Sequence, residues 1–185
     1  MLTDAFDYEK ALNVLLYVVD QLGMPGYHQT FKTLYFAEQR SLATYGSAIV
    51  GDGFVKMEAG PVPSEIYNMV KIADGRNQDN RLSEGYIQTV RQHLRAVAPH
   101  RLQALMTPDL DFLSDTDREC LDAAIEFCRN RSYQDLKDIS HDTAWDAASM
   151  SSFMDTLKIA AAGGADEVAL KYLEEGLMDS SYYAA

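Results

Sequence analysis

The sequence predicts a mainly α fold of the α+β class, a helical domain with a small three-stranded antiparallel β-sheet. Three observations predict this fold. Apolar residues recur at steps of three and four along several long segments, which is the spacing of one helix face. Strict alternation of apolar and polar residues is confined to two short regions, residues 55–59 and 94–106. Glycine, proline and serine stand between the segments, where helices and strands begin and end.

Two helices joined by a short link are predicted at the start of the chain. Residues 8–22 have an apolar stripe that is closed by Gly23, and residues 27–45 have a second stripe that is closed by Gly46. Helices with so short a connection pack as an antiparallel pair.

A corner between a strand and a helix is predicted next. The alternating strand at residues 55–59 leads into Gly60-Pro61-Val62-Pro63, where the two prolines are expected to prevent strand hydrogen bonding. Ser64 can cap the helix that follows, which runs to about Asp74. Gly60 is expected to fix the angle of the corner, because a glycine at a sharp turn supplies a positive φ or a close backbone approach.

The rest of the chain continues the helical pattern around one further sheet element. Polar residues 75–80 predict a surface loop, and residues 94–106 predict a β-hairpin that joins the strand near Val55 in one sheet. Ser114 and Ser132 are typical caps of two helices. The helices expected in this part carry the following apolar residues: Leu121 and Ile125, Leu136 and Ile139, Trp145, Phe153 and Leu157, and Val168 and Leu173.

The composition is that of one domain. The chain has 185 residues, of which 47% are hydrophobic and 24% charged. A chain of this length and hydrophobic content can bury a core of its own, and the charged fraction is ordinary for a soluble domain. We expect a single domain over residues 1–178 and a flexible C-terminal tail over residues 179–185. The N-terminus has acids before any apolar run, and no apolar stretch approaches the roughly 18 residues that a membrane span needs. These features predict a cytoplasmic protein that has no membrane partner.

The net charge of −12 is concentrated in the second part of the chain. Residues 1–106 carry 10 Lys and Arg against 11 Asp and Glu, a net of −1, whereas residues 107–185 carry 6 against 17, a net of −11. An acidic surface repels nucleic acid and suits either solubility or docking to a basic partner protein. Basic residues near the predicted hairpin come with no groove-reading motif, so the sequence argues against nucleic acid as a partner.

No catalytic, metal or cofactor site is predicted from spacing. The histidines and cysteines lack the HxxxH and CxxC groupings of a zinc site, and the glycines near residues 51 and 60 lack the sequel of a phosphate-binding loop. Cys120 and Cys128 lie about 12 Å apart on one predicted helix, too far for a disulfide. A packed thiol is inert. A hydrolase that pairs one of these cysteines with a histidine base stays open as an alternative.

A family resemblance rests on motifs spread over residues 8–175. They are Lys32-Thr33-Leu34-Tyr35-Phe36-Ala37, Tyr45-Gly46, Ile49-Val50-Gly51-Asp52, Phe54-Val55, Gly60-Pro61-Val62-Pro63, Ile66-Tyr67, Leu113-Ser114, Leu121-Asp122, Ser140-His141 and Ala144-Trp145. Together they resemble the signature of the Panacea domain, the SocA-like antitoxin family, whose members are also met as phage-associated proteins. The combination of K-x-x-Y-F-A with a later G-P-V-P is specific to this pattern.

The resemblance implies a function in a bacterial or phage toxin–antitoxin system. It implies a non-catalytic antitoxin that neutralises a co-encoded protein toxin by direct binding, on a mainly helical fold with a small antiparallel sheet. One alternative is a proteolytic adaptor that delivers a toxin or another client to a Clp-type protease. The second alternative is the cysteine–histidine hydrolase described above. The small apolar end, Ala184-Ala185, is a candidate degradation signal, and an ordinary frayed terminus is the alternative.

The signature residues fall into two groups of expected roles. Aromatic residues dominate binding hot spots when they are exposed, so four of them are candidates for contacting the partner, with a place in the core as the alternative. These four are Tyr35, Tyr45, Phe54 and Tyr67. The others are expected to be structural: Lys32, Gly51, Gly60, Pro61, Pro63, His141 and Trp145. His141 and Trp145 are four residues apart and would share a face if one helix carries both.

Overall fold

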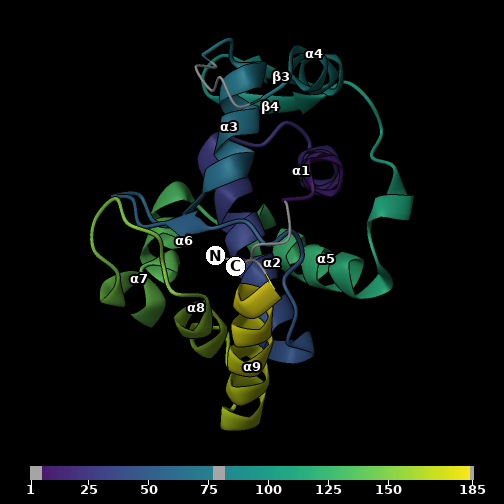
Figure 1. The fold of residues 1–185 in the computed structure, drawn as a ribbon. Coiled ribbons are helices and arrows are strands. Elements are labelled where there is room, and N and C mark those ends of the chain that lie inside the picture. Colours follow the sequence, from purple (N-terminus) through teal and green to yellow (C-terminus); the bar gives the residue numbers. More distant parts are fainter. Residues whose placement is uncertain (1–5, 77–81, 184–185) are drawn as a thin grey trace.

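Helix α2 (Tyr27–Tyr45) runs through the middle of the molecule, as Figure 1 shows. The computed structural model describes residues 6–76 and 82–183, with the side chains of 179–183 excepted. Eleven of the nineteen residues of α2 are buried, so this helix lacks the broad solvent face of a surface helix. It ends at Gly46, whose φ of 63° turns the chain away and whose N–H donates to the carbonyl of Leu42 (3.2 Å).

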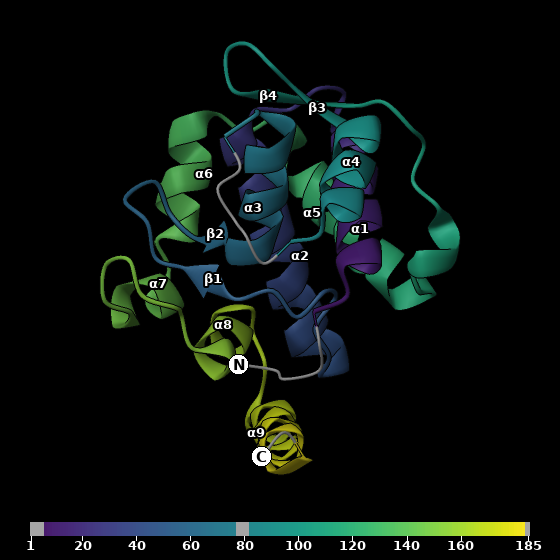
Figure 2. The ribbon, with the colours of Figure 1, turned by 45° about the horizontal axis from the view of Figure 1, so that its top comes forward.

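The other elements surround α2 from both halves of the chain (Figures 1 and 2). The helices before residue 100 are α1 (Tyr8–Leu22), α3 (Ser64–Ala73) and α4 (Glu84–His93). Those after it are α5 (Asp115–Arg129), α6 (Tyr133–Ser140), α7 (Thr143–Ala147), α8 (Thr156–Ala162) and α9 (Glu167–Tyr183), preceded by a short 3-10 helix, η1 (Leu110–Phe112). The strands are β1 (Phe54–Val55), β2 (Val62–Pro63), β3 (Leu94–Val97) and β4 (Arg101–Ala104).

The mainly α fold is confirmed, but the predicted three-stranded sheet is not one sheet. Over the described residues β1 pairs with β2 and β3 pairs with β4, each antiparallel, with Phe54 opposite Pro63 in the first pair. The outer edge of β4 is taken by the α1–α2 link, where Leu102 N–H donates to the carbonyl of Pro25 (2.9 Å). Residues 151–154 lie against β1 instead, and Met154 N–H donates to the carbonyl of Phe54 (2.8 Å).

The corner between β2 and α3 differs from the prediction in two details. Pro63 does lie in a strand, because the pairing with β1 at this point is made by the next residue, Ser64, which donates its N–H to the carbonyl of Gly53 (2.9 Å), and requires no N–H from Pro63. Ser64 is already inside α3, so it does not cap the helix. Asp52, in the segment before β1, caps the helix instead, and its carboxylate accepts from the N–H groups of Glu65 (3.0 Å) and Ile66 (2.9 Å).

Helix α4 was not predicted, and α9 is longer than the sequence suggested. In α4 only Ile87 and Val90 are buried, so its apolar stripe is too short to stand out. The predicted tail starts at residue 179, but the backbone of α9 stays helical to Tyr183. Ala184-Ala185 and most of the loop predicted at residues 75–80 lie outside the described residues.

Two clusters of buried side chains form the core. The larger lies between α1, α2, α3 and α5, and the smaller joins α2 to β1, α7, α8 and α9. The smaller cluster contains Tyr35, Leu42, Phe54, Ala144, Met154, Ile159, Ala160 and Leu173. Within the ranges described, no helix has the combination of length and apolarity that crossing a membrane requires.

Candidate functional site

The turn between β1 and β2, residues 56–61, is held by side chains that come from helices far along the chain. Lys32 of α2 donates from Nζ to the carbonyl of Pro61 (2.7 Å). His28, one turn earlier in α2, has Nε2 at 3.1 Å from the carbonyl of Ala59. Trp145 of α7 donates from Nε1 to the carbonyl of Met57 (3.1 Å). These three contacts all hold the turn through its backbone carbonyls.

Lys32 is the most unusual of these residues, because its side chain is long, charged and only 1% exposed. A buried ammonium loses its hydration, and this burial lowers the pKa of Lys32 to about 7. In both protonation states Nζ keeps a hydrogen to donate to Pro61. A lysine that cannot reach solvent cannot contact a substrate. Lys32 therefore supports the turn structurally, through its hydrogen bond to Pro61.

Gly60 lies where the turn comes closest to α2 and α6. Its φ is 99°, a backbone conformation that favours glycine. A Cβ atom at this position would lie 2.7 Å from Cε and 2.9 Å from Nζ of Lys32, and would also collide with Oγ of Ser140. Ser140 itself is the last residue of α6 and is fully buried. The close approach of three segments therefore depends on the missing side chain.

His141 and Trp145 stack on each other across a corner rather than along one helix. Their rings are parallel to within 6°, with centroids 3.7 Å apart, but α6 ends at residue 140 and α7 begins at residue 143. Lys56 of the turn places Nζ 3.8 Å from the Trp145 ring centroid and donates to the carbonyl of Ala148 (3.1 Å). Burial, which disfavours the charged ring, lowers the pKa of His141. The His141 and Trp145 rings are thus uncharged, and the Lys56 side chain lies over the Trp145 ring in the geometry of a cation–π interaction.

Tyr35 connects α2 to the corner between α6 and α7 through Asp142. The Tyr35 hydroxyl donates to Oδ2 of Asp142 (2.9 Å), and Gln39 donates to the same oxygen from Nε2 (2.7 Å). Oδ1 of Asp142 accepts from the N–H groups of Ala144 (3.0 Å) and Trp145 (3.1 Å) and so caps α7. Burial, followed by the Asp142 charge, raises the pKa of Tyr35, so the phenol stays protonated and keeps donating.

The four aromatic candidates for partner binding do not share one environment. Tyr35 is 0% and Phe54 3% exposed, and their rings meet edge to face with centroids 5.2 Å apart. Tyr67 is half-buried against Phe31 in the other cluster. Tyr45 is 36% exposed, and its hydroxyl donates to Oε2 of Glu119 (2.7 Å). Burial favours the core role for Tyr35 and Phe54, whereas Tyr45 keeps a surface on which a partner could bind.

Several residues around the turn, from Lys32 to Trp145, belong to the sequence motifs, and they meet although more than a hundred residues separate the first from the last. A family model described as antitoxin SocA-like, Panacea domain, matches residues 31–146. The chain belongs to the SocA-like antitoxin family. The match covers more than half of the chain and includes Lys32, the turn and the His141–Trp145 stack. No curated protein and no solved structure matched the chain in the corresponding comparisons.

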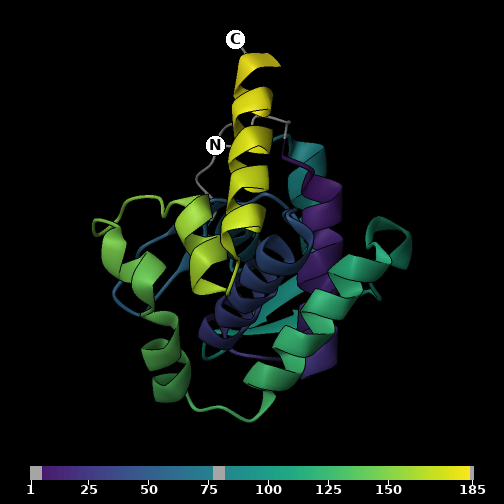
Figure 3. The ribbon, with the colours of Figure 1, turned by 90° about the horizontal axis from the view of Figure 1, so that it is seen from below.

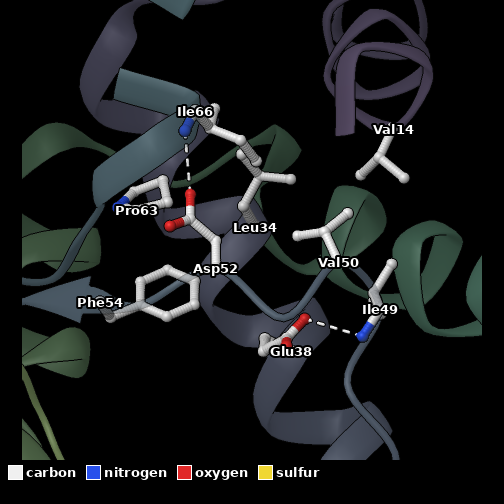
Figure 4. Close-up of a pocket in the computed structure, with 9 residues that line it drawn as sticks. All are labelled: Val14, Leu34, Glu38, Ile49, Val50, Asp52, Phe54, Pro63 and Ile66. Atoms are coloured by element: carbon white, nitrogen blue, oxygen red, sulfur yellow. Dashed lines mark hydrogen bonds between the residues drawn. The ribbon is translucent and has the colours of Figure 1, made fainter. Parts of the chain in front are cut away.

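Within this Panacea domain, two buried carboxyl groups line a small cavity between α1, α2 and the segment before β1 (Figure 4). Glu38 accepts from the N–H of Ile49 (3.1 Å), and Asp52 caps α3 as described above. The cavity measures about 10 Å³, the space of roughly one water molecule, and its other walls are apolar. It therefore has no room for a substrate. Across the described residues, no three His, Cys, Asp or Glu side chains are grouped so as to bind a metal ion.

Burial raises the pKa of Glu38 from 4.5 to about 7 and that of Asp52 from 3.8 to about 6. Both carboxyl groups therefore hold a proton in the folded protein at pH values where the unfolded chain has lost it. A raised folded pKa favours the folded state below the unfolded value, and this contribution is lost as the pH rises through the folded value. For Glu38 that window runs from about pH 4.5 to about pH 7.

The variant Glu38→Gln tests this electrostatic interpretation. Glutamine is neutral at all these pH values and keeps an oxygen that can accept from Ile49. Relative to the wild type, its free energy of unfolding should be unchanged near pH 4 and higher by roughly 3 kcal/mol at pH 8, from about 1.36 kcal/mol per pKa unit. Urea unfolding at several pH values measures the difference, with the exposed Glu126→Gln as control. If the unfolding free energies of Glu38→Gln and of the wild type changed with pH in parallel, burial would not keep Glu38 protonated.

Sequence reasoning named neither His28, Glu38 nor Asp142 among the site residues of the Panacea domain. Asp142 had a local signal, since it stands where a cap of α7 is expected, but its partner Tyr35 is 107 residues away. His28 had none, because its contact is with a backbone carbonyl, and any residue in the turn could supply that. Such contacts come from tertiary packing, and no residue spacing in the sequence predicts them.

Proposed function

We propose that the chain is an antitoxin that neutralises a co-encoded protein toxin by direct binding. The observation that carries this proposal is the family match over residues 31–146, the part that contains the turn together with Lys32 and Trp145, two of the three side chains that hold it. A turn fixed from three sides is a rigid platform. Rigid surfaces lose little conformational entropy on association, which favours tight binding.

The placement of the two cysteines weighs against the hydrolase alternative. Cys120 and Cys128 are free thiols that form no disulfide with each other, and the side chains of both are 0% exposed. Burial, which disfavours the thiolate, raises the pKa of Cys120, and it raises that of Cys128 to about 11. A cysteine nucleophile needs an accessible thiolate, and neither position offers one near neutral pH.

The surface of the protein carries side chains that are suited to a binding interface. Large apolar side chains are exposed on several elements, and aromatic and methionine side chains are enriched in protein interfaces. They include Tyr45, Met57, Phe127, Tyr133, Met150, Phe153, Tyr172 and Met178. A proteolytic adaptor would need such a surface as well, so the amount of toxin in the cell must separate the two functions.

Growth of cells that express the neighbouring reading frame tests the proposal. That product alone should stop growth, and co-expression of this chain should restore growth while the toxin level on an immunoblot stays the same. Restored growth with a falling toxin level would favour the adaptor. A Cys120→Ala, Cys128→Ala variant should restore growth as the wild type does. Failure of the folded wild-type chain to protect cells against the neighbouring product would contradict the proposal.

A further inference from the structure

The hairpin of β3 and β4 is a basic part of an acidic protein. It lies at the end of the molecule opposite to α9, at the top of Figure 1 and behind α2 in Figure 3. Residues 91–106 contain three arginines and no acid, whereas the whole chain has a net charge of −12. Arg91, Arg95 and Arg101 are all exposed. A surface of this sign attracts an acidic partner and repels a basic one.

The charges of these arginines are not neutralised by the hairpin itself. Arg95 donates to Oε1 of Gln103 (2.9 Å), and Arg101 donates to the carbonyl of Met24 (2.8 Å), so both bond to uncharged acceptors. Over the described residues, no ion pair joins any of the three arginines to a carboxylate. Their guanidinium groups can therefore bind carboxylates from another molecule.

The helices that pack on β3, which are α3 and α4, do not supply the missing negative charge. The last turn of α4 carries Arg91 and leads directly into β3, while its acid, Glu84, stands in the first turn. Asp74, at the end of α3, is paired with Arg76. Glu65, in the first turn of α3, accepts hydrogen bonds from side chains of α1 and α3. The acids of both helices therefore leave the positive charge of the hairpin uncompensated.

The outer edge of β3 is open, in contrast to that of β4. Leu102 uses its N–H for the α1–α2 link and so points away from β3, and Ala96, which lies opposite it, points away from β4 in the same way. Within the described ranges, neither the N–H nor the carbonyl of Ala96 has a hydrogen-bond partner. Leu94 is buried and Arg95 exposed, so one face of the strand is covered and the other faces water. A further polypeptide strand can add at an open edge of this kind.

The open edge and the charge beside it fit one kind of occupant. A strand edge offers N–H and carbonyl groups at a spacing that a polypeptide can match and a nucleic acid cannot. Arginines next to the edge favour acidic side chains, whereas a second copy of the hairpin would bring like charges together. From these observations we infer that the outer edge of β3 receives an extended acidic segment of the partner protein as an added strand. This inference rests on the proposed function, in which the partner is the co-encoded toxin.

Charge reversal beside the edge tests the inference. The purified toxin is titrated with the wild-type chain, with Arg91→Glu, Arg95→Glu, and with Lys158→Glu, Lys171→Glu as a control. The control changes exposed lysines of α8 and α9, far from the hairpin in Figure 1, and alters the net charge equally. The hairpin variant should bind more weakly by about tenfold or more, and the control by less than about threefold.

Ala96→Pro tests the added strand without changing any charge. Proline removes the outward N–H of residue 96 but no hydrogen bond between β3 and β4, so toxin binding should weaken by about tenfold or more while the melting temperature changes little. Amide hydrogen exchange of the wild type, followed by NMR, is an independent measurement. The N–H of Ala96 should exchange more slowly by about tenfold or more in the complex, and that of Gln103, which already bonds to β3, should change little.

The outcomes separate this inference from the function on which it rests. Normal binding by either folded hairpin variant, an equal loss in the control, or unchanged exchange at Ala96 would overturn the docking site and leave the antitoxin function standing. Absence of any binding by the wild type would overturn the proposed function and the inference with it. Duplex DNA, single-stranded RNA and a second copy of the chain are tested in the same way. Binding of any of these that Arg91→Glu, Arg95→Glu abolishes would assign the edge to that occupant and would overturn the inference.

Discussion

Replacing Gly60 by valine is expected to produce the largest loss of stability of any single change considered for this protein. The residue has a φ of 99°, and its Cα faces Lys32 and Ser140 at distances that leave no room for a side chain. Strain of the backbone costs about 1–3 kcal/mol and overpacking costs a similar amount. We therefore expect a loss of roughly 2–6 kcal/mol, a large part of the about 5–15 kcal/mol that stabilises an ordinary domain. Thermal unfolding followed by circular dichroism measures it.

Gly164 provides a matched control for this prediction. Its φ is 95°, nearly the same as that of Gly60, but a Cβ there would meet nothing within 4 Å. Gly164→Val should therefore show the cost of backbone strain alone, about 1–3 kcal/mol. The difference between the two variants measures the crowding around the turn. Equal melting temperatures for Gly60→Val and Gly164→Val would show that the contacts with Lys32 and Ser140 are not tight.

Tyr35→Ala is expected to have the second-largest effect, through the core. The side chain is fully buried, and large-to-small changes of buried aromatic residues cost about 3–5 kcal/mol. The change also removes the hydroxyl that donates to Asp142, the cap of α7. We expect the variant to lose both its fold and its ability to protect cells. Circular dichroism and growth rescue measured on the same variant check this.

Tyr35→Phe separates the packing of the ring from its hydrogen bond. It keeps the ring against Phe54 and leaves Asp142 with the donors from Gln39, Ala144 and Trp145. A loss of about 1–3 kcal/mol is expected, with rescue retained. A Tyr35→Ala variant that folds normally but fails to rescue would instead place Tyr35 in the binding surface, and would contradict the burial seen here.

Most of the helices, though not α4, were predictable because their signals are local. Gly23 and Gly46 end α1 and α2 where the sequence indicated, and Ser114 and Ser132 cap α5 and α6 through reciprocal side-chain bonds. The sheet was predictable only in part. The strand predicted at residues 55–59 is wrong in its bounds, because β1 is Phe54–Val55 and residues 56–61 form the turn. Its neighbours were not predicted either, since tertiary packing decides which edge a strand pairs with.

The sequence motifs named some of the residues around the turn, such as Lys32 and Trp145, but not His28 or Asp142, and they gave no arrangement of these side chains. Gly60 carried a local reason, the sharp turn, and that reason can be stated from sequence alone. Lys32 carried none, since a lysine on an amphipathic helix normally faces water. Its burial follows from α2 being enclosed on all sides, a property of the assembled fold.

The central claim is that the chain acts by binding and not by catalysis, and a titration with purified proteins tests it most directly. A fixed amount of toxin is mixed with increasing amounts of the chain, and the toxin's residual activity and covalent mass are measured over time. Direct binding predicts that activity falls in proportion to the chain added, reaches its minimum at a fixed molar ratio, and leaves the toxin's mass unchanged. Complete inactivation by a small fraction of an equivalent, growing with time or accompanied by a change in the toxin's mass, would contradict the account.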